Sequence, residues 1–234
     1  SVDPGIPTNY EVAFTGSKPG RILFEVETYS SPSQSGNEHV RITEVWAVDE
    51  DGDNLTNLTR MNGTTPSGLT SYRKLASVSP DGLQLAFVVE SEDQSDHLSV
   101  MDTYGKGLTQ LTHRETDVFT QILSLNWTAD SSRLAYTVHE MDFRQKPTLE
   151  FSNSYLIKAD GSDVKSILNS PSGDASTTPP FVFMSLSHHD NYVAFSVDWS
   201  RQHQANYISV QNRIDGELLW KLHGVSDQDL KWSP

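Results

Sequence analysis

A turn followed by a short apolar strand recurs four times in this chain of 234 residues, and every copy closes on an aromatic residue. The closing residues are Phe24, Phe87, Tyr136 and Phe195, which lie 63, 49 and 59 residues apart. Such a period constrains the fold strongly, because a single repeat cannot bury its apolar face alone and must stack on its neighbours. The chain is therefore expected to be an array of similar units.

The second half of each copy repeats in the same phase. An alternating strand, a turn and a second short strand occur at 45–59, 98–112, 155–168 and 207–222. The first two of these segments match without a gap at Asp, Gly, Leu, Thr, Leu and Thr. Glycine after aspartate suits a tight hairpin that needs positive φ, and β-branched or aromatic residues flank it. Because the sequence has no comparable amphipathic helix, the units are predicted to be all-β.

We predict a β-propeller of four-stranded antiparallel blades, since such blades repeat every ~40–50 residues and loop insertions lengthen the steps here. The blades of this single propeller domain or fragment are assigned to residues 10–66, 70–115, 120–170 and 180–224, and the opening strand of a further blade to 226–234. Two interpretations of the last segment stay open. Either these four blades are part of a larger ring, or the terminal strand completes the first blade of a small ring.

The second copy resembles the repeat of a known family. Its turn and strands are found at 79–82, 85–87, 98–102 and 108–112. This order is similar to the TolB-type (WD-like) β-propeller repeat, and Trp232-Ser233-Pro234 resembles the opening of the next such repeat. The resemblance implies an extracytoplasmic setting, which means the periplasm, the cell surface or secretion. It also implies a possible role as an accessory subunit of an envelope assembly.

The third and fourth copies depart from the Pro-Asp-Gly turn of that family. They read Thr128-Ala129-Asp130-Ser131 and Ser187-His188-His189-Asp190. The departure concerns the local geometry of the turn and not the existence of the blade.

Charge and composition exclude several classes of partner. The chain has 17 Lys and Arg against 31 Asp and Glu, a formal charge of −14, which repels a phosphate backbone. No nucleic-acid partner is therefore expected. No run of 18 apolar residues occurs, so direct membrane insertion is not expected either. The absence of cysteine excludes disulfides, thiolate metal sites and a thiol nucleophile.

Three alternating carboxylates, Asp49, Asp51 and Asp53, resemble the start of a calcium loop. Position twelve of that loop is Arg60, where a bidentate glutamate is expected. The second copy has Asp102, Tyr104 and Lys106 at the three equivalent places, so the turn forms without the acids. We therefore interpret the segment as a hairpin turn, with calcium as the alternative, and predict no other cofactor or metal.

No catalytic residue is predicted from the sequence. The pair His188 and His189 beside Asp190 could suggest a metal site, but adjacent strand residues point to opposite faces and cannot readily chelate one ion. We interpret them as solvated turn residues. A Gly-x-Ser-x-Gly nucleophile elbow and a glycine-rich phosphate loop are both absent from the sequence.

Binding residues are predicted in long insertions that join the second and third strands of three blades, at 28–41, 140–153 and 198–204. These loops should emerge on the same rim, where recognition residues are commonly placed on a rigid scaffold. The candidate binding-loop residues are Trp199, Arg201, His203, Phe143 and Arg144. Trp127 and Trp232, by contrast, occupy repeat-opening positions and are expected in the core.

These observations favour a non-enzymatic module that binds a protein or a glycan through the loop-bearing rim or the central channel. The alternative is the propeller domain of a larger enzyme. That enzyme would be either a prolyl-oligopeptidase-type serine peptidase with its hydrolase domain elsewhere, or a polysaccharide lyase that uses a histidine-bound metal. A third possibility is a purely structural spacer, because fold does not determine function.

Overall fold

Every regular element that the structure describes is a β-strand, as the repeats predict. The computed structural model describes residues 10–18, 20–29, 41–59, 71–91, 95–113, 118–144, 149–169, 173–174, 181–187, 189, 191–198, 207–212 and 217–224. This part of the chain contains no helix that is long and apolar enough to cross a membrane.

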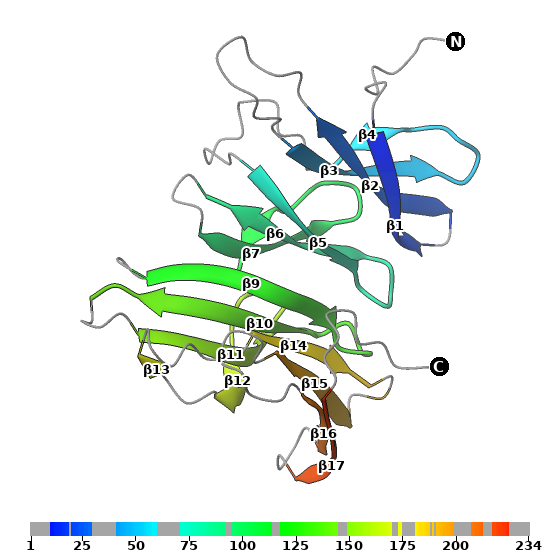
Figure 1. Ribbon diagram of the computed structural model, residues 1–234. Coiled ribbons are helices and arrows are strands. Elements are labelled where there is room, and N and C mark those ends of the chain that lie inside the picture. The colour runs from blue at the N-terminus through cyan, green and yellow to red at the C-terminus, as the bar shows by residue number, and fades with distance from the viewer. Residues whose placement is uncertain are drawn as a thin grey trace. The chain divides into compact units, whose positions relative to one another are not determined.

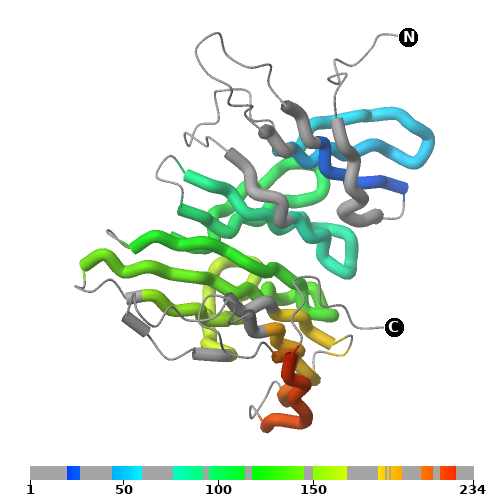
Figure 2. Tube along the Cα trace, viewed as in Figure 1, coloured from blue at the N-terminus to red at the C-terminus, as the bar shows by residue number. Residues whose placement is uncertain are grey.

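The strands form four antiparallel sheets, and the chain completes one sheet before it enters the next (Figures 1 and 2). The first sheet has the order β1 (Tyr10–Lys18), β2 (Arg21–Tyr29), β3 (Arg41–Asp49) and β4 (Thr56–Asn57). The second has the order β5 (Ser71–Val78), β6 (Gln84–Glu90), β7 (Asp96–Asp102) and β8 (Thr109–Gln110).

The third and fourth sheets follow the same order of strands. The third contains β9 (Val118–Trp127), β10 (Arg133–Asp142), β11 (Leu149–Lys158) and β12 (Lys165–Asn169), and a short extra strand, β13 (Gly173–Asp174), also pairs with β11. The fourth contains β14 (Phe181–Leu186), β15 (Tyr192–Asp198), β16 (Tyr207–Asn212) and β17 (Leu218–His223).

The contacts divide the chain into two compact units, each with its own core. The first unit comprises Ser1–Gln94 and Leu98–Thr109, and the second comprises Ser95–His97 and Gln110–Pro234. The core of the first unit consists of Leu23, Val45, Ala47, Leu85, Phe87, Val89 and Met101. The core of the second consists of Ala135, Leu156, Met184, Leu186, Val193 and Phe195. Each cluster draws its residues from two consecutive sheets, which is how stacked repeats bury their faces.

A hydroxyl contact recurs at the turn between the first two strands in the second, third and fourth sheets, although the sequence of the turn differs. The Ser79, Thr128 and Ser187 hydroxyls each accept a hydrogen bond from the backbone N–H five residues later, at 2.9, 3.0 and 3.0 Å. In the third copy Ser131 replaces Gly82 and still has positive φ, +61° against +71°. In the third copy, the departure from Pro-Asp-Gly therefore leaves the turn intact.

The turn after the third strand confirms the predicted equivalence of the Asp-Gly segments. The N–H groups of Gly52, Gly105 and Gly161 donate to the carbonyl three residues earlier, at 2.9, 3.0 and 2.9 Å. All three glycines have φ between +80° and +87°, a region that is strained for other residues. The chain thus turns alike whether the segment carries three acids or one.

Candidate functional site

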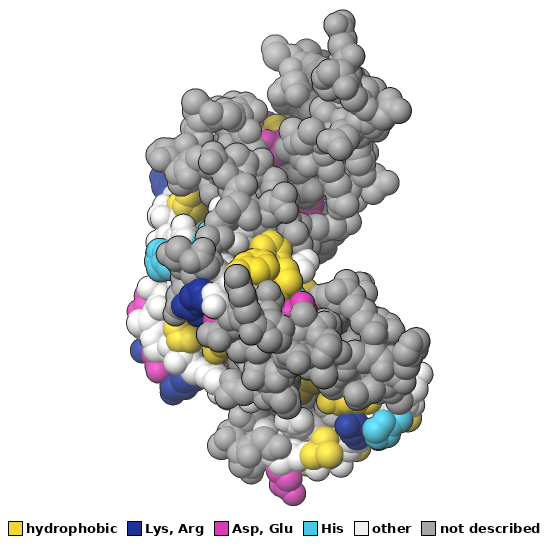
Figure 3. Space-filling view, turned by 60° about the vertical axis from the view of Figure 1, so that its left-hand side comes forward, with side chains coloured by type: hydrophobic (Ala, Val, Ile, Leu, Met, Phe, Trp, Pro, Cys, Tyr) yellow, Lys and Arg dark blue, Asp and Glu magenta, His cyan; other side chains and the backbone are white. Residues whose placement is uncertain are grey.

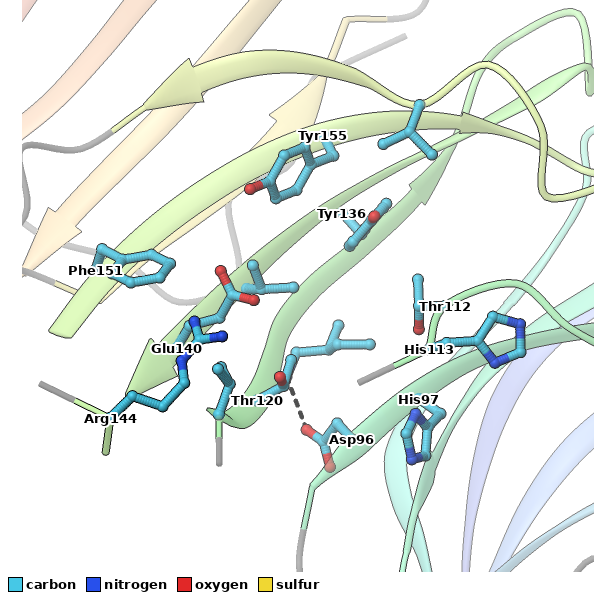
Figure 4. Close-up of a pocket in the computed structure, with 14 residues that line it drawn as sticks. Asp96, His97, Thr112, His113, Thr120, Tyr136, Glu140, Arg144, Phe151 and Tyr155 are labelled. Carbon is cyan, nitrogen blue, oxygen red and sulfur yellow. Dashed lines mark hydrogen bonds between the residues drawn. The ribbon is translucent and has the colours of Figure 1, made fainter. Parts of the chain in front are cut away.

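A pocket of about 550 Å³ lies on one face of β9, β10 and β11, within the second compact unit (Figure 4). Fourteen residues line it, and they include aromatic, charged and aliphatic side chains. Among them are Tyr136, Phe151 and Tyr155; Asp96, Glu140 and Arg144; and Val118, Ile122 and Val138. This mixture of an apolar wall with a few polar groups is typical of ligand sites, whose volumes run from about 300 to 1,000 Å³.

Strand periodicity and register bring these side chains together. Tyr136, Val138 and Glu140 alternate along β10, so they share one face of the sheet. The antiparallel register pairs Tyr136 with Tyr155 and Glu140 with Phe151, which adds the side chains of β11 to the same face. The wall of the pocket is therefore a direct consequence of two paired strands.

A bulge in β9 and the carboxylate of Asp96 form another side of the pocket. The β9–β10 register shifts between Thr137 and Val138. Close to this shift, the Ile122 N–H donates a 2.8 Å hydrogen bond to Asp96 Oδ2. Asp96 is only 2% exposed, and it belongs to the second compact unit together with the strand it contacts. A charge-assisted bond of this kind fixes the buried carboxylate in place.

The two tyrosines and Glu140 form an electrostatically coupled group. The Tyr136 and Tyr155 rings lie with centroids 5.6 Å apart and planes tilted by 33°. Burial raises the pKa of both phenols above the ordinary value, and the nearby Glu140 carboxylate raises both further. A second anion is thus disfavoured beside Glu140, because desolvation and like charge both oppose it.

Arg144 lies at the start of the β10–β11 connection that was predicted to bind, and Asp142 holds its guanidinium. The Nε and Nη2 atoms of Arg144 donate to the two Asp142 carboxylate oxygens at 2.8 and 2.9 Å. These bonds lower the pKa of Asp142. Figure 4 shows Arg144, Glu140 and Phe151 on one side of the pocket, with His97 and His113 on the other. Bidentate pairing of this type is directional, so it orients the arginine.

The opposite face of the same strands carries a polar group that the sequence analysis did not anticipate. His139 Nδ1 lies 3.2 Å from Ser152 Oγ, and His139 Nε2 lies 3.7 Å from Glu150 Oε2. The arrangement has the order of a serine–histidine–acid triad. Ser152 is fully buried, however, and a nucleophile must reach its substrate. We therefore assign the group a structural role in joining β10 to β11.

Solved structures resemble this chain, although no protein-family model and no curated protein matches it. A prolyl endopeptidase matches with 15% identity over 93% of this chain and 30% of its own, at a TM-score of 0.58. The β-propeller domain of the Trilobed protease from Pyrococcus furiosus matches with 12% identity over 93% and 58%, at 0.54. A putative TolB from Agrobacterium tumefaciens matches with 14% identity over 90% and 92%, at only 0.33.

The fold is a β-propeller. Its blades are the four sheets, and the visible blades are consistent with a partial ring. The chain spans about a third of the length of the prolyl endopeptidase, 30%. At these identities the likeness shows the fold and not the activity. The TolB-type repeat itself stays a prediction, because no family model matches and a TM-score of 0.33 is too low to argue from.

The predicted binding-loop residues fall partly on the third blade. Arg144 lines the pocket, and Phe143 beside it is 52% exposed. The other three candidates, Trp199, Arg201 and His203, lie outside the described residues. The structure thus places one predicted residue at the pocket and leaves the wider rim prediction untested.

The predicted core tryptophan of the third blade is confirmed, and its counterpart is not described. Trp127 is 7% exposed, whereas Trp232 lies outside the described residues. His189 is exposed, and its predicted neighbours His188 and Asp190 are likewise outside the described part.

The acidic segment of the first blade uses its carboxylates within the turn. Asp49 Oδ2 accepts a 2.6 Å hydrogen bond from Asn54 Nδ2, and Asp49 Oδ1 lies 3.5 Å from the Arg21 guanidinium. Asp51 Oδ1 accepts the Asp53 N–H at 3.0 Å. Among the described residues, no three His, Asp or Glu side chains are grouped in a way that could hold a metal ion. The arrangement is that of a hairpin turn.

One face of the molecule shows how the described charged side chains are spread. On the face drawn in Figure 3, acidic and basic side chains of the described residues are interspersed with hydrophobic ones.

Proposed function

We propose that this propeller is a non-enzymatic binding module that receives part of a protein partner in the pocket of the third blade. One observation carries the proposal. The pocket combines the aromatic side chains of Tyr136, Tyr155 and Phe151 with charged side chains, in a volume suited to a side chain or a short peptide segment. Aromatic residues and arginine are the types that most often dominate binding energy at interfaces.

The polar contacts of the pocket support binding more than catalysis. The Arg144 guanidinium is oriented by Asp142, and the Asp96 carboxylate is held by the Ile122 N–H. These contacts preorganise the site, which lowers the entropic cost of capturing a partner. The histidine–serine pair that could suggest nucleophilic chemistry is buried on the other face of the blade.

We further propose an extracytoplasmic setting, in which the module is an accessory subunit of a larger assembly. The support is the resemblance of the repeat at 79–112 to the TolB-type family. Fractionation of the source cells with an antibody against this chain tests the setting. Recovery in the cytoplasmic fraction alone would remove it.

Peptide and oligosaccharide arrays test the binding function. Labelled protein should bind a subset of peptides, and Phe151→Ala should reduce that binding because it removes part of the aromatic wall. Leu218→Ala is the matched control, since Leu218 is an exposed apolar residue of the same unit but is not part of the pocket. Equal binding by both variants would overturn the assignment of the pocket. Binding to oligosaccharides alone would replace the protein partner with a glycan.

A second candidate is the propeller domain of a prolyl-oligopeptidase-type peptidase. It is favoured by the match to a prolyl endopeptidase over 93% of this chain at a TM-score of 0.58. The reading frame that encodes this chain tests it. A hydrolase domain with a nucleophile elbow in the same frame, together with cleavage of proline-containing peptides by the whole protein, would support this candidate. A frame without such a domain would eliminate it.

A further inference from the structure

We propose that Asn54, in the turn between β3 and β4 (Figure 1), is the acceptor of an N-linked glycan. The inference goes beyond the binding function and rests on the proposed extracytoplasmic setting, because a chain meets a glycosylating enzyme only when it is exported. The acceptors of such glycans are Asn-x-Ser/Thr tripeptides in which x is not proline. The sequence contains four of them, which begin at Asn54, Asn57, Asn62 and Asn126.

The first tripeptide is accessible at both of the side chains that define it. Asn54 and Thr56 are exposed, and so are the preceding residues 51–53. Asn54 Nδ2 donates a 2.6 Å hydrogen bond to Asp49 Oδ2. An asparagine amide has two such hydrogens, and a glycan replaces one of them. The other hydrogen is therefore still available for the bond to Asp49 after the glycan is attached.

The tripeptide at 57–59 is held against β3 of the first blade. The side-chain oxygen of Asn57 is buried, and the strand register places Asn57 opposite Trp46. Thr59 Oγ1 accepts a 2.8 Å hydrogen bond from the Val45 N–H. Because a glycan is bulky and requires a surface position, attachment at Asn57 would disrupt the pairing of β3 with β4.

The tripeptide at 126–128 is held between two strands of the second compact unit. Asn126 Nδ2 donates a 2.9 Å hydrogen bond to the Met184 carbonyl of β14. Thr128 is only 3% exposed, and its hydroxyl donates to Asp130 Oδ1 at 2.7 Å. A saccharide on Asn126 would have to separate β9 from β14, so the folded blade excludes it.

Among the tripeptides that the structure describes, the one at 54–56 is therefore the exposed acceptor; residues 62–64 lie outside the described part. The glycan would come from an oligosaccharide carried on a lipid pyrophosphate. The bond between the first sugar carbon and the pyrophosphate oxygen breaks, and a bond between that carbon and Asn54 Nδ2 forms. Nδ2 releases one proton, and the lipid pyrophosphate leaves with the electron pair of the broken bond.

The second blade indicates a control variant that keeps the turn. Thr56 Oγ1 donates to the Asn54 carbonyl at 2.8 Å, and Thr109 Oγ1 donates in the same way to the Gly107 carbonyl at 3.1 Å. Asn54 and Gly107 both have positive φ, +55° and +68°. Asparagine and glycine adopt this region more readily than most residues. Asn54→Gly therefore removes the acceptor amide and preserves the backbone of the turn.

Export of the chain from a cell line that glycosylates secreted proteins tests the inference. A cleavable signal sequence directs the export, and the secreted protein is digested with trypsin and with peptide N-glycosidase in H₂¹⁸O. Release of a glycan converts the occupied asparagine to ¹⁸O-labelled aspartate, which mass spectrometry locates. Cleavage after Arg60 places Asn62 on a different peptide from Asn54. We expect the label at Asn54 and none at Asn57 or Asn126.

Three variants assign the label to the tripeptide at 54–56. Asn54→Gly and Thr56→Ala should each abolish the labelled site, whereas Thr56→Ser should keep it, because serine supplies the same hydroxyl. Secretion of the variants in amounts equal to the unaltered protein is the control for folding. An unlabelled Asn54 in the secreted protein would overturn the inference. Label at Asn57 or Asn126 in place of Asn54 would overturn it as well.

These outcomes are separate from those that test the proposed function. The signal sequence imposes the export, so an unlabelled Asn54 counts against the acceptor site and not against the proposed setting. Recovery of the native chain in the cytoplasmic fraction alone would remove the setting, and with it a glycan on the native protein, even if Asn54 is labelled after imposed export. The peptide arrays use unglycosylated protein, so a failure of the binding function leaves the result at Asn54 unchanged.

Discussion

Substitutions at one position of the repeat should cost different amounts of stability in the first and second blades. Ile22 and Leu85 each stand two residues before the closing aromatic residue of their repeat. Leu85 is fully buried in the core of the first unit, whereas Ile22 is 40% exposed. We predict that Leu85→Ala destabilises the protein about twice as much as Ile22→Ala.

The magnitude follows from the buried carbons. Each alanine substitution removes three carbons, worth ~0.8 kcal/mol apiece when they are fully buried, or ~2.4 kcal/mol in total. At Leu85 a closed cavity adds to this term, so the loss should reach about 3–4 kcal/mol. At Ile22 only about 60% of the surface is removed from solvent, and solvent can fill the space, so the loss should be ~1.5 kcal/mol.

Urea unfolding followed by tryptophan fluorescence measures both losses, with the m-value as a check that the same cooperative unit is observed. The two positions lie in the same compact unit, so differences between units do not enter the comparison. Equal losses of unfolding free energy in the two variants, or a larger loss at Ile22, would refute the difference in burial between the two positions.

Three further perturbations test local features. Ser131→Gly should raise the melting temperature slightly in calorimetry, since Ser131 has positive φ and a serine there costs ~1 kcal/mol that glycine avoids; a lower melting temperature would contradict this. The hydrogen bond from the Thr128 hydroxyl and those from Ser132 lower the pKa of Asp130 from 3.8 to about 2. The ionised Asp130 carboxylate therefore stabilises the folded protein at pH values above 3.8, and this stabilisation is lost as the pH falls toward 2. Asp130→Asn should therefore lower the free energy of unfolding more at pH 5 than at pH 2, compared with the unaltered protein. A difference between the two proteins that does not change with pH would contradict this prediction. Ser152→Ala leaves the Nδ1 atom of buried His139 without its hydroxyl partner and should cost about 1–3 kcal/mol of unfolding free energy. An unchanged urea midpoint would show that the bond contributes nothing.

The blades and their turns were predictable from sequence because they depend on local chemistry. Glycine at positions 52, 105 and 161 marks the same hairpin in three blades. A side-chain hydroxyl is kept at the start of the turn between the first two strands even where Pro-Asp-Gly is absent. These signals lie within a few residues of the structure they specify. Fold class therefore followed from the repeat without knowledge of any distant contact.

The pocket was less predictable because it depends on register and on residues far apart in the chain. Asp96 reaches Ile122 across 26 positions, at a bulge in β9 that no local pattern marks. Tyr136 and Glu140 share a face because they alternate along β10, whereas their partners Tyr155 and Phe151 follow only from the β10–β11 pairing. The length of the insertion at 140–153 indicated the connection that carries Arg144. It could not show that Arg144 lines the pocket.

The measurement that tests the pocket most directly is the titration of its tyrosines in protein labelled with ¹³C at tyrosine Cζ. Burial and Glu140 together raise the pKa of Tyr155, whereas burial alone raises that of Tyr207 on another blade. We predict that Glu140→Gln lowers the pKa of Tyr155 and leaves Tyr207 where it was. A Tyr155 titration that does not move, or an equal shift at both tyrosines, would contradict the grouping of Glu140 with the aromatic wall.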